Sequence, residues 1–249
     1  MRNIWTIARR EYKHYFISPI AYIMALVVLL VIGIYFTIVL YYYSNQAMMY
    51  GATPPDTTII IGPMATIFVF ATPALTMRLL ADEQRMGTLE LLLTAPVRDG
   101  ELVIGKWLGA FFFVLTIIAI TLIYPIILNR LSNPGIDQGI MVASYIAIIL
   151  LVASYVAIGT AMSSFFSNQF AAFFATLAVL LIFWWLIRLP TYILPSGFFN
   201  SLFTYLDLNG RFNSMLGGSI SLSDIIYPFS LITLGLVLGT VAVEIRRWR

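Results

Sequence analysis

The chain has 249 residues, of which 61% are hydrophobic and only 10% are charged. A soluble domain carries roughly 25% charged residues, so this composition excludes an ordinary soluble protein. The net charge is +3, and the absence of cysteine from the sequence excludes disulfides and thiolate metal sites.

Six uncharged apolar stretches are long enough to cross a bilayer as helices, since a helix crosses the ~30 Å hydrocarbon core in ~20 residues. The stretches are Ile20–Tyr42, Ile59–Met77, Trp107–Leu128, Ile140–Met162, Phe170–Ile187 and Ile225–Val243. The connections between them are too short to hold another domain of ordinary size. Residues 1–249 are therefore expected to form one transmembrane domain of an all-α polytopic membrane protein.

The cations are divided unevenly between the two sides of this six-span topology. Of the 14 Lys and Arg residues, 11 lie on the side of the termini, and only Arg130, Arg188 and Arg211 lie on the other side. The positive-inside rule predicts that both termini and the loop Arg78–Lys106 are cytoplasmic. The expected location is the cytoplasmic (inner) membrane, crossed several times.

Residues 3–16 have the pattern of a basic amphipathic helix. Arg9, Arg10, Lys13 and His14 lie largely on one face, and apolar residues with the helical period lie on the other. Such a helix before a span is typical of an interfacial elbow helix, with its cations near anionic headgroups. It either anchors the topology or also touches a partner. The residues assigned to the elbow helix are Ile4, Ile7, Arg9, Arg10, Tyr12 and Lys13.

The 29-residue loop Arg78–Lys106 is too long for a tight turn and too short to fold alone. Arg78–Met86 is expected to extend the second span as a solvated helix, and Gly87 to break it. Thr88–Thr94 is expected to be a short helix that ends before the following proline, and Asp99 the N-cap of the next helix. The leucines of so short a helix have no core of their own, which predicts that it docks onto a partner.

Residues Gly100 to Lys106 match the phosphate-binding pattern G-x-x-x-x-G-K. Trp107 stands where Ser or Thr would hold Mg²⁺, and no strand pattern precedes the segment, so nucleotide binding by this chain is not expected. The six stretches also lack charged residues, which argues against a proton relay and against a polar catalytic set in the membrane. Energy for any transport is expected to come from another polypeptide.

The external segment Pro190–Leu222 is expected to form short helices instead of two more spans. Burying Asp207 and Arg211 in lipid would cost roughly 2–4 kcal/mol each. Phenylalanine and leucine residues in the same segment still provide one apolar face, so partial burial is expected.

The loop between the second and third spans also resembles a known family. The run from Ala81 to Val97, followed by Gly105-Lys106, resembles the intracellular loop of ABC-2 type transporter permeases, with the pattern E-x-G-T-x-E-x-L-L-x-x-P and then G-K. Glu83 stands two places earlier than the acid frequent in that family. The resemblance covers nearly the whole chain, including an external ending similar to F-x-x-G-x-I-x-L-x-D. The nearest subgroup is the gliding-motility-type permeases, with the related permeases of copper-enzyme maturation.

This resemblance implies a permease subunit of an ATP-driven transporter, usually an exporter, that works as a homodimer or heterodimer of permeases in the lipid bilayer. A separate cytoplasmic ABC ATPase subunit would hold ATP and magnesium, so the chain itself is expected to be no enzyme, to carry no cofactor or metal and to bind no nucleic acid. The coupling residues that the resemblance implies are Glu83, Gly87, Thr88, Leu89, Glu90, Leu92, Leu93 and Pro96.

Two other functions stay open from the sequence. One is a non-transporting assembly or force-transmitting subunit of an ATPase-linked complex, for which the substantial external segment leaves room. The other, more remote, is a membrane-embedded enzyme, for which the spans offer no paired acids and no Ser/Lys or His cluster.

Overall fold

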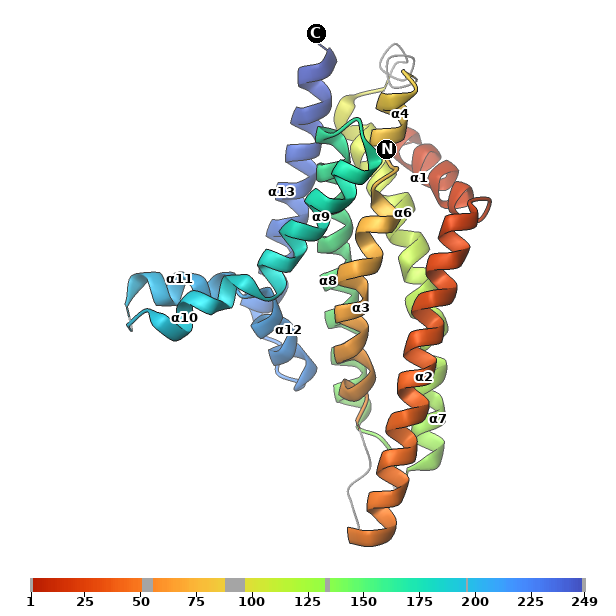
Figure 1. The fold of residues 1–249 in the computed structure, drawn as a ribbon, viewed down its shortest axis with the longest axis vertical. Coiled ribbons are helices and arrows are strands. Elements are labelled where there is room, and N and C mark those ends of the chain that lie inside the picture. The colour runs from red at the N-terminus through yellow and green to blue at the C-terminus, as the bar shows by residue number, and fades with distance from the viewer. Residues whose placement is uncertain (1, 51–55, 88–96, 133–134, 196, 248–249) are drawn as a thin grey trace.

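The computed structural model describes residues 2–50, 56–87, 97–132, 135–195 and 197–247, and the regular elements in these ranges are helices (Figure 1). Six helical segments among them are long and apolar enough to cross a bilayer: Pro19–Asn45, Thr58–Arg85, Asp99–Leu131, Gln138–Phe165, Gln169–Ile193 and Leu222–Arg246. Each of these segments contains one of the six apolar stretches of the sequence. The expected all-α fold with six spans is confirmed.

The helices follow one another along the chain as α1 (Arg2–Tyr15), α2 (Pro19–Tyr50), α3 (Thr58–Thr76), α4 (Ala81–Arg85), α6 (Asp99–Thr121), α7 (Ile123–Leu131), α8 (Gln138–Phe165), α9 (Gln169–Trp184), the 3₁₀ turn η1 (Leu186–Arg188), α10 (Leu189–Ile193), α11 (Phe198–Leu206), α12 (Leu208–Leu216) and α13 (Leu222–Arg247). The two termini lie at the same end of the bundle, at the top of Figure 1. We call this the terminal end.

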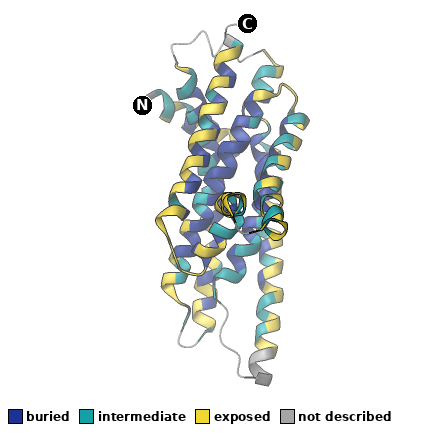
Figure 2. Cartoon of the chain, turned by 90° about the vertical axis from the view of Figure 1, so that its left-hand side faces the viewer, coloured by how far each residue is buried: buried dark blue, intermediate teal, exposed yellow. Residues whose placement is uncertain are grey.

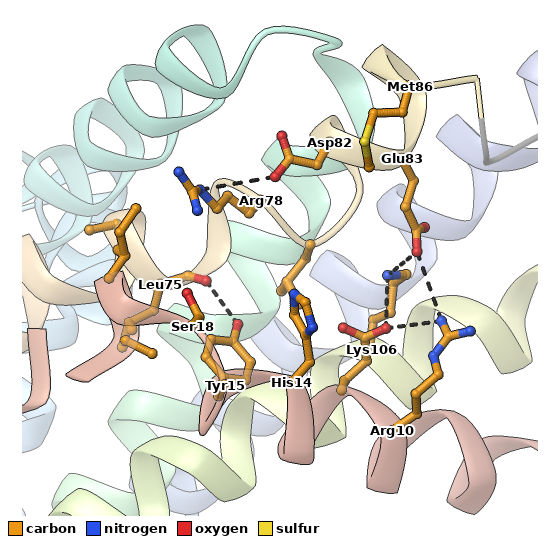
Figure 3. A pocket seen from close by; sticks show the side chains of 15 residues that line it. Arg10, His14, Tyr15, Ser18, Leu75, Arg78, Asp82, Glu83, Met86 and Lys106 are labelled. Carbon is orange, nitrogen blue, oxygen red and sulfur yellow. Dashed lines mark hydrogen bonds and ion pairs between the residues drawn. The ribbon is translucent and has the colours of Figure 1, made fainter. Parts of the chain in front are cut away.

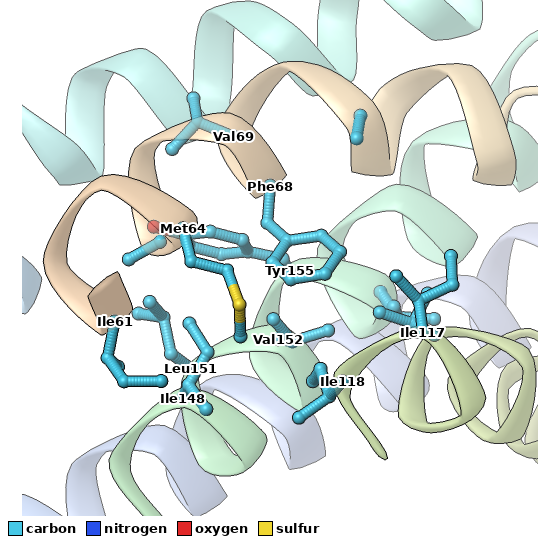
Figure 4. Packing of buried hydrophobic residues seen from close by; sticks show 14 of the residues in the cluster. Ile61, Met64, Phe68, Val69, Ile117, Ile118, Ile148, Leu151, Val152 and Tyr155 are labelled. Atoms are coloured by element: carbon cyan, nitrogen blue, oxygen red, sulfur yellow. The ribbon is translucent and has the colours of Figure 1, made fainter. Parts of the chain in front are cut away.

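Helix α8 lies at the centre of the bundle, where it packs against α3, α6, α9 and α13. Figure 4 shows part of this core, in which Met64 and Phe68 of α3 lie against Ile148 and Tyr155 of α8, with Ile117 of α6 nearby. All five side chains are buried. The centre of the bundle is therefore a packed apolar core.

The outer surface of the bundle is apolar as well. Large apolar side chains of α2 that are more than half exposed include Leu26, Leu30, Ile34 and Ile38. Figure 2 shows the exposed residues on the outside of the bundle and the buried ones inside. A large exposed apolar surface is unfavourable in water. It suits the hydrocarbon core of a bilayer, where helices satisfy their own backbone hydrogen bonds.

Small residues allow the central helices to approach one another closely. A Cβ atom added to Gly235 of α13 would lie 2.9 Å from the backbone carbonyl of Ala157 in α8. One added to Gly159 of α8 would collide with the Thr76 side chain of α3. These glycines therefore serve helix packing within the chain.

The second span does not continue as one solvated helix into the loop, so this expectation from the sequence is wrong. Helix α3 ends at Thr76, a turn follows, and the separate five-residue helix α4 begins at Ala81. Leu79, Leu80 and Ala81 are buried, so this connection packs against the bundle. Gly87 follows α4 with a φ of 69°, a left-handed conformation that favours glycine and suits its expected helix-breaking position.

The residues between the fifth and sixth apolar stretches of the sequence form the expected short helices. Helices α10, α11 and α12 have 5, 9 and 9 residues, too few to cross a bilayer. In Figure 1, α10 and α11 project sideways from the bundle. They expose large apolar side chains, among them Tyr192, Ile193, Phe198 and Phe199.

Candidate functional site

A lysine is buried where α6 approaches the terminal end of the bundle. The side chain of Lys106, in the second turn of α6, is only 2% exposed. Its Nζ atom lies 3.2 Å from Oε1 of Glu11 in α1 and 2.8 Å from Oε1 of Glu83 in α4. These carboxylates satisfy an ammonium group that would otherwise be costly to bury.

Arg10 completes this group of charges. Its Nη2 atom lies 3.0 Å from Oε1 of Glu11 and 3.8 Å from Oε1 of Glu83 (Figure 3). We call Arg10, Glu11, Glu83 and Lys106 the Lys106 cluster, which contains two cations and two carboxylates. It joins three elements, and its longest ion pair, between Glu11 and Lys106, spans 95 positions in the chain.

Two glycines of α6 bring α1 close enough for the cluster to form. A Cβ atom at Gly109 would lie 2.5 Å from Cβ of Glu11 and 2.9 Å from the carbonyl oxygen of Ala8. A Cβ atom at Gly105 would lie 2.8 Å from Cβ of Ile7. The spacing Gly-x-x-x-Gly places both glycines on one face of α6, so larger residues there would hold α1 away from Lys106.

Hydrogen bonds fix α1 along α6 on both sides of the cluster. The side-chain amide of Asn3 donates to Glu101 at 3.1 Å, and the hydroxyls of Tyr12 and Thr116 lie 3.1 Å apart. Because residue numbers rise together along both helices, α1 runs beside α6 in the same direction. Helix α1 is therefore a packed part of the transmembrane domain.

The start of α6 differs from the expectation that Asp99 is its N-cap. Arg98 has extended backbone angles and is the N-cap, and Asp99 is the first helical residue. The carboxylate of Glu101 accepts a hydrogen bond from the backbone N–H of Arg98 at 3.2 Å. The acid three residues into the helix, and not the first acid of the segment, thus caps this end.

Helix α4 is anchored to α8 as well as to Lys106. The hydroxyl oxygen of Ser163 accepts hydrogen bonds from the backbone N–H groups of Leu80 and Ala81, at 3.0 and 3.1 Å. The side-chain amide of Gln84 donates to the carbonyl oxygen of Ser164 at 2.8 Å. The helix that leads into residues 88–96 is therefore held by α8 on one side and by the cluster on the other.

The surroundings of Glu11 favour its ionised form. Burial by itself raises the pKa of this carboxyl, but the ammonium of Lys106 and the guanidinium of Arg10 outweigh burial, so the pKa of Glu11 lies below its ordinary value. Burial, together with the nearby Glu11 charge, raises the pKa of Tyr15, whose hydroxyl donates to the carbonyl oxygen of Leu75 at 2.8 Å. Glu11 is therefore a charged partner and Tyr15 a neutral donor at ordinary pH.

A cavity of about 520 Å³ opens beside the Lys106 cluster. Its apolar lining includes Ile20, Ala21, Ala74, Leu75 and Leu79, and its polar lining includes the cluster together with His14, Ser18, Arg78 and Asp82 (Figure 3). His14 is exposed and lies at this cavity. The Nε atom of Arg78 lies 4.0 Å from Oδ2 of Asp82, so the cations around the cavity have acidic neighbours.

The predicted coupling residues are only partly within the described chain. Glu83 belongs to the Lys106 cluster, and Gly87 ends α4. Thr88, Leu89, Glu90, Leu92, Leu93 and Pro96 lie outside the described residues, and so does the expected helix Thr88–Thr94.

The predicted elbow residues divide into three groups in the structure. Arg10 belongs to the Lys106 cluster, and Arg9 and Lys13 are exposed. The half-buried members are Ile4, Ile7 and Tyr12. The apolar face of α1 thus packs on α6, while two of its cations point outward.

Sequence reasoning missed Glu11 and Gly109 as members of this site. The signal for Glu11 was its position, because it follows Ile7 by four residues and Ala8 by three and so lies on the apolar face of a basic helix. A lone acid on a face that becomes buried requires a cation. The signal for Gly109 was its spacing of four residues from Gly105.

The segment that matches the phosphate-binding pattern is helical throughout, because Gly100 and Lys106 both lie in α6. Gly105 serves the contact with α1, and Lys106 serves the cluster. The match to the pattern therefore has its origin in helix packing.

These observations define a multi-pass α-helical membrane protein with α1 packed on its third span. A family model described as "ABC-2 family transporter protein" matches residues 5–201, well over half of the chain. The chain therefore belongs to the ABC-2 family of transporter proteins, which are membrane components of ABC transporters. No curated protein matches the chain. The family match does not separate subgroups, so the gliding-motility-type subgroup stays a prediction.

Proposed function

We propose that this chain is the permease subunit of an ATP-driven exporter of the cytoplasmic membrane. A separate cytoplasmic ABC ATPase holds ATP and magnesium and receives the Thr88–Thr94 segment. A second permease, either a copy of this chain or a related one, completes the transmembrane unit. Both termini and the 88–96 segment lie in the cytoplasm, in agreement with the positions of the cations.

The observation that carries this proposal is the anchoring of α4 at the base of the 88–96 segment. Hydrogen bonds from Leu80, Ala81 and Gln84 join α4 to α8, and the ion pair of Glu83 with Lys106 joins it to α6 and α1. Packed helices transmit displacement because they have little free volume to absorb it. A push on the 88–96 segment is thus delivered to several spans at once, as a coupling device requires.

The cargo is amphipathic or apolar. The six apolar stretches of the sequence contain no charged residue that could hold a small inorganic ion by opposite charge. The charges that are buried within the described residues, Glu11, Lys106, Asp207 and Asp224, each have an ion-pair partner and lie outside the apolar stretches. This distribution leaves the middle of the domain suited to groups that tolerate a low dielectric.

The test of coupling is co-purification of the ATPase and its ATP turnover with a variant of the docking segment. A buried leucine contributes about 1.5–3 kcal/mol, so Leu92→Asp is expected to reduce ATPase binding or stimulated turnover by at least about tenfold. Glu90→Gln is expected to weaken coupling without abolishing assembly. The matched control is Leu131→Asp, which places the same change at the other end of the bundle. Wild-type binding and turnover for Leu92→Asp would remove the docking assignment.

Transport itself separates the exporter from a non-transporting assembly subunit. Vesicles that contain the permease and its ATPase are expected to accumulate amphipathic cargo when ATP is supplied outside, and not when ATP hydrolysis is blocked. ATP turnover that requires the permease, but moves none of a broad panel of amphipathic compounds, would favour the assembly subunit.

The orientation of the chain in the membrane can be tested separately. Because the chain has no native cysteine, single cysteines can be introduced and labelled. A single cysteine at position 90 is expected to react with an impermeant reagent only after cells are opened. One at Asp137 is expected to react in intact cells. The opposite result for either position would overturn the proposed orientation.

A further inference from the structure

A second groove lies on the other side of α1, away from the Lys106 cluster. It has a volume of about 610 Å³ and is formed by α1 and the third span. Its lining consists of Trp5, Ala8, Arg9, Tyr12, Lys13, Phe112, Leu115, Thr116 and Ala119. The groove therefore combines the outward face of α1 with the outward face of α6.

The walls of this groove are held in place by contacts between the two helices. The rings of Trp5 and Phe112 pack edge to face with centroids 6.0 Å apart. The hydroxyls of Tyr12 and Thr116 lie 3.1 Å apart. The buried Ala8 provides a floor where α1 meets α6. The shape of the groove thus follows from the same close packing that forms the cluster.

The charge of the groove is of one sign. Arg9 and Lys13 are its only charged lining residues, both are exposed, and neither has an ion pair with a residue that the structure describes. They are four residues apart on α1, so they lie on one face of the helix, one turn from each other. In the first cavity, by contrast, Arg10 and Lys106 are balanced by carboxylates.

The remainder of the lining is apolar and continues along α6 toward the membrane interior. Phe112 and Leu115 are half-buried, and Ala119 is exposed one turn further from the terminal end. An acyl chain fits such a surface because each buried methylene contributes favourably. A negative headgroup fits the two cations above it.

We propose that this groove binds an anionic phospholipid from the leaflet at the terminal end of the bundle. Its phosphate lies between Arg9 and Lys13, and one acyl chain follows Phe112, Leu115 and Ala119. The bound lipid covers the seam between α1 and α6. The inference rests on the family and the multi-pass fold and does not depend on export or on the ATPase.

The experiment uses the full chain in phosphatidylcholine vesicles that contain a small fraction of phosphatidylglycerol with a photoreactive acyl chain. After illumination, the labelled residues are mapped by mass spectrometry. Labelling is expected at residues 112–119 of α6. It is expected to be displaced by unlabelled phosphatidylglycerol and not by extra phosphatidylcholine or by soluble glycerol phosphate.

Charge variants test the headgroup contact. Each surface cation contributes roughly a fivefold gain in affinity for an anionic lipid, so Arg9→Gln and Lys13→Gln are each expected to lower labelling about fivefold, and the double variant about 25-fold. The matched control is Arg85→Gln with Arg98→Gln, which removes two exposed cations from the same end of the bundle but outside the groove. The control is expected to retain wild-type labelling.

A volume variant tests the acyl contact separately. Ala119→Phe fills the lower part of the groove without changing charge, and is expected to move labelling away from residues 112–119. Unchanged labelling in the Arg9/Lys13 double variant, equal labelling by a photoreactive phosphatidylcholine, or displacement by glycerol phosphate would each overturn the proposal. Cross-linking of Arg9→Cys to a second copy of the chain in place of lipid would also overturn it.

Discussion

Two clusters of described residues bury charge, and they differ in the distance along the chain that they bridge. In the Lys106 cluster, the carboxylates lie 95 and 23 residues from the lysine. The second cluster contains Arg211 and Asp224 with their neighbours Tyr205, Ser221 and Tyr227, and we call it the Arg211 cluster. Its central ion pair joins residues 13 positions apart, with Nη1 of Arg211 3.3 Å from Oδ1 of Asp224.

The Arg211 cluster is also supported by local aromatic and capping contacts. The guanidinium of Arg211 lies 4.2 Å from the ring centroid of Tyr205 and 5.1 Å from that of Tyr227. Asp224 accepts hydrogen bonds from the backbone N–H and the hydroxyl of Ser221, the arrangement of a capped helix start. This cluster thus fixes the turn from α12 into α13.

The comparison teaches that buried ion pairs serve different purposes according to what they connect. The Arg211 cluster closes one local turn, so its loss is expected to loosen that turn alone. The Lys106 cluster connects α1, α4 and α6, so its loss is expected to separate elements that the chain itself does not hold together. Variants of the two clusters are therefore expected to differ in their effect on coupling as well as on stability.

The largest effect is expected for Lys106→Met, which keeps the length of the side chain and removes its charge. Glu11 and Glu83 would lose the buried ammonium that lies between them, which is expected to lower the free energy of unfolding by about 3–5 kcal/mol. Thermal unfolding in detergent measures the change, and ATP turnover with the proposed ATPase partner measures coupling. Arg85→Met, an exposed cation of α4, is expected to change stability by less than about 0.5 kcal/mol. Equal stability of the two variants would contradict the role of the cluster.

A smaller effect is expected for Gly109→Val, which tests whether close packing of α1 is required for the cluster. The added side chain meets Glu11 and Ala8, so α1 must shift, at a cost of about 1–3 kcal/mol. Gly62→Ala in α3 is the control, since a Cβ there meets no atom within 4 Å, and it is expected to be neutral or to stabilise by up to about 1 kcal/mol. Cysteines placed at Asn3 and Glu101 report the separation of the helices by their rate of disulfide formation. An unaltered rate of disulfide formation in Gly109→Val would argue against close packing of α1 on α6 at Gly109.

A substitution in the Arg211 cluster is expected to change the stability of the protein and not its coupling to the proposed ATPase. Arg211→Gln removes the ion pair of the buried Asp224, which keeps its Ser221 hydrogen bonds, and is expected to cost about 1–3 kcal/mol. Binding and turnover of the ATPase are expected to stay at the wild-type level at temperatures where the variant is folded. If turnover fell while the unfolding temperature stayed the same, the distinction between the two clusters would be lost.

The smallest effect concerns pH. Because the pKa of Glu11 in the folded protein lies below the ordinary value of 4.5, its contribution to stability is complete above that value and is lost as the pH falls through the folded pKa. No change from this group is expected between about pH 6 and 8. Unfolding temperatures measured from pH 6 downward are expected to fall less steeply for Glu11→Gln than for the wild type. Parallel curves for the two proteins would contradict the assignment.

Much of the fold was accessible from the sequence, whereas the candidate site was accessible only in part. Glu83, Arg10 and the importance of Gly105-Lys106 follow from local patterns or from the family resemblance. Glu11 was not identified, because nothing within a window of ten or twenty residues indicates which cation it meets. The ion pair requires α1 and α6 to pack first, and that packing depends on glycines in a distant segment.

The sequence by itself determined the six spans, the uneven division of Lys and Arg between the two ends of the bundle, and the glycine that ends α4. Each of these depends on hydropathy, charge or backbone freedom within a short stretch of chain. Only the tertiary structure decided that the second span breaks before Ala81, that Arg98 caps α6, and that Lys106 is buried between two carboxylates. These features depend on which helices touch, and contact between helices is set by the packing of small and large side chains far apart in the chain.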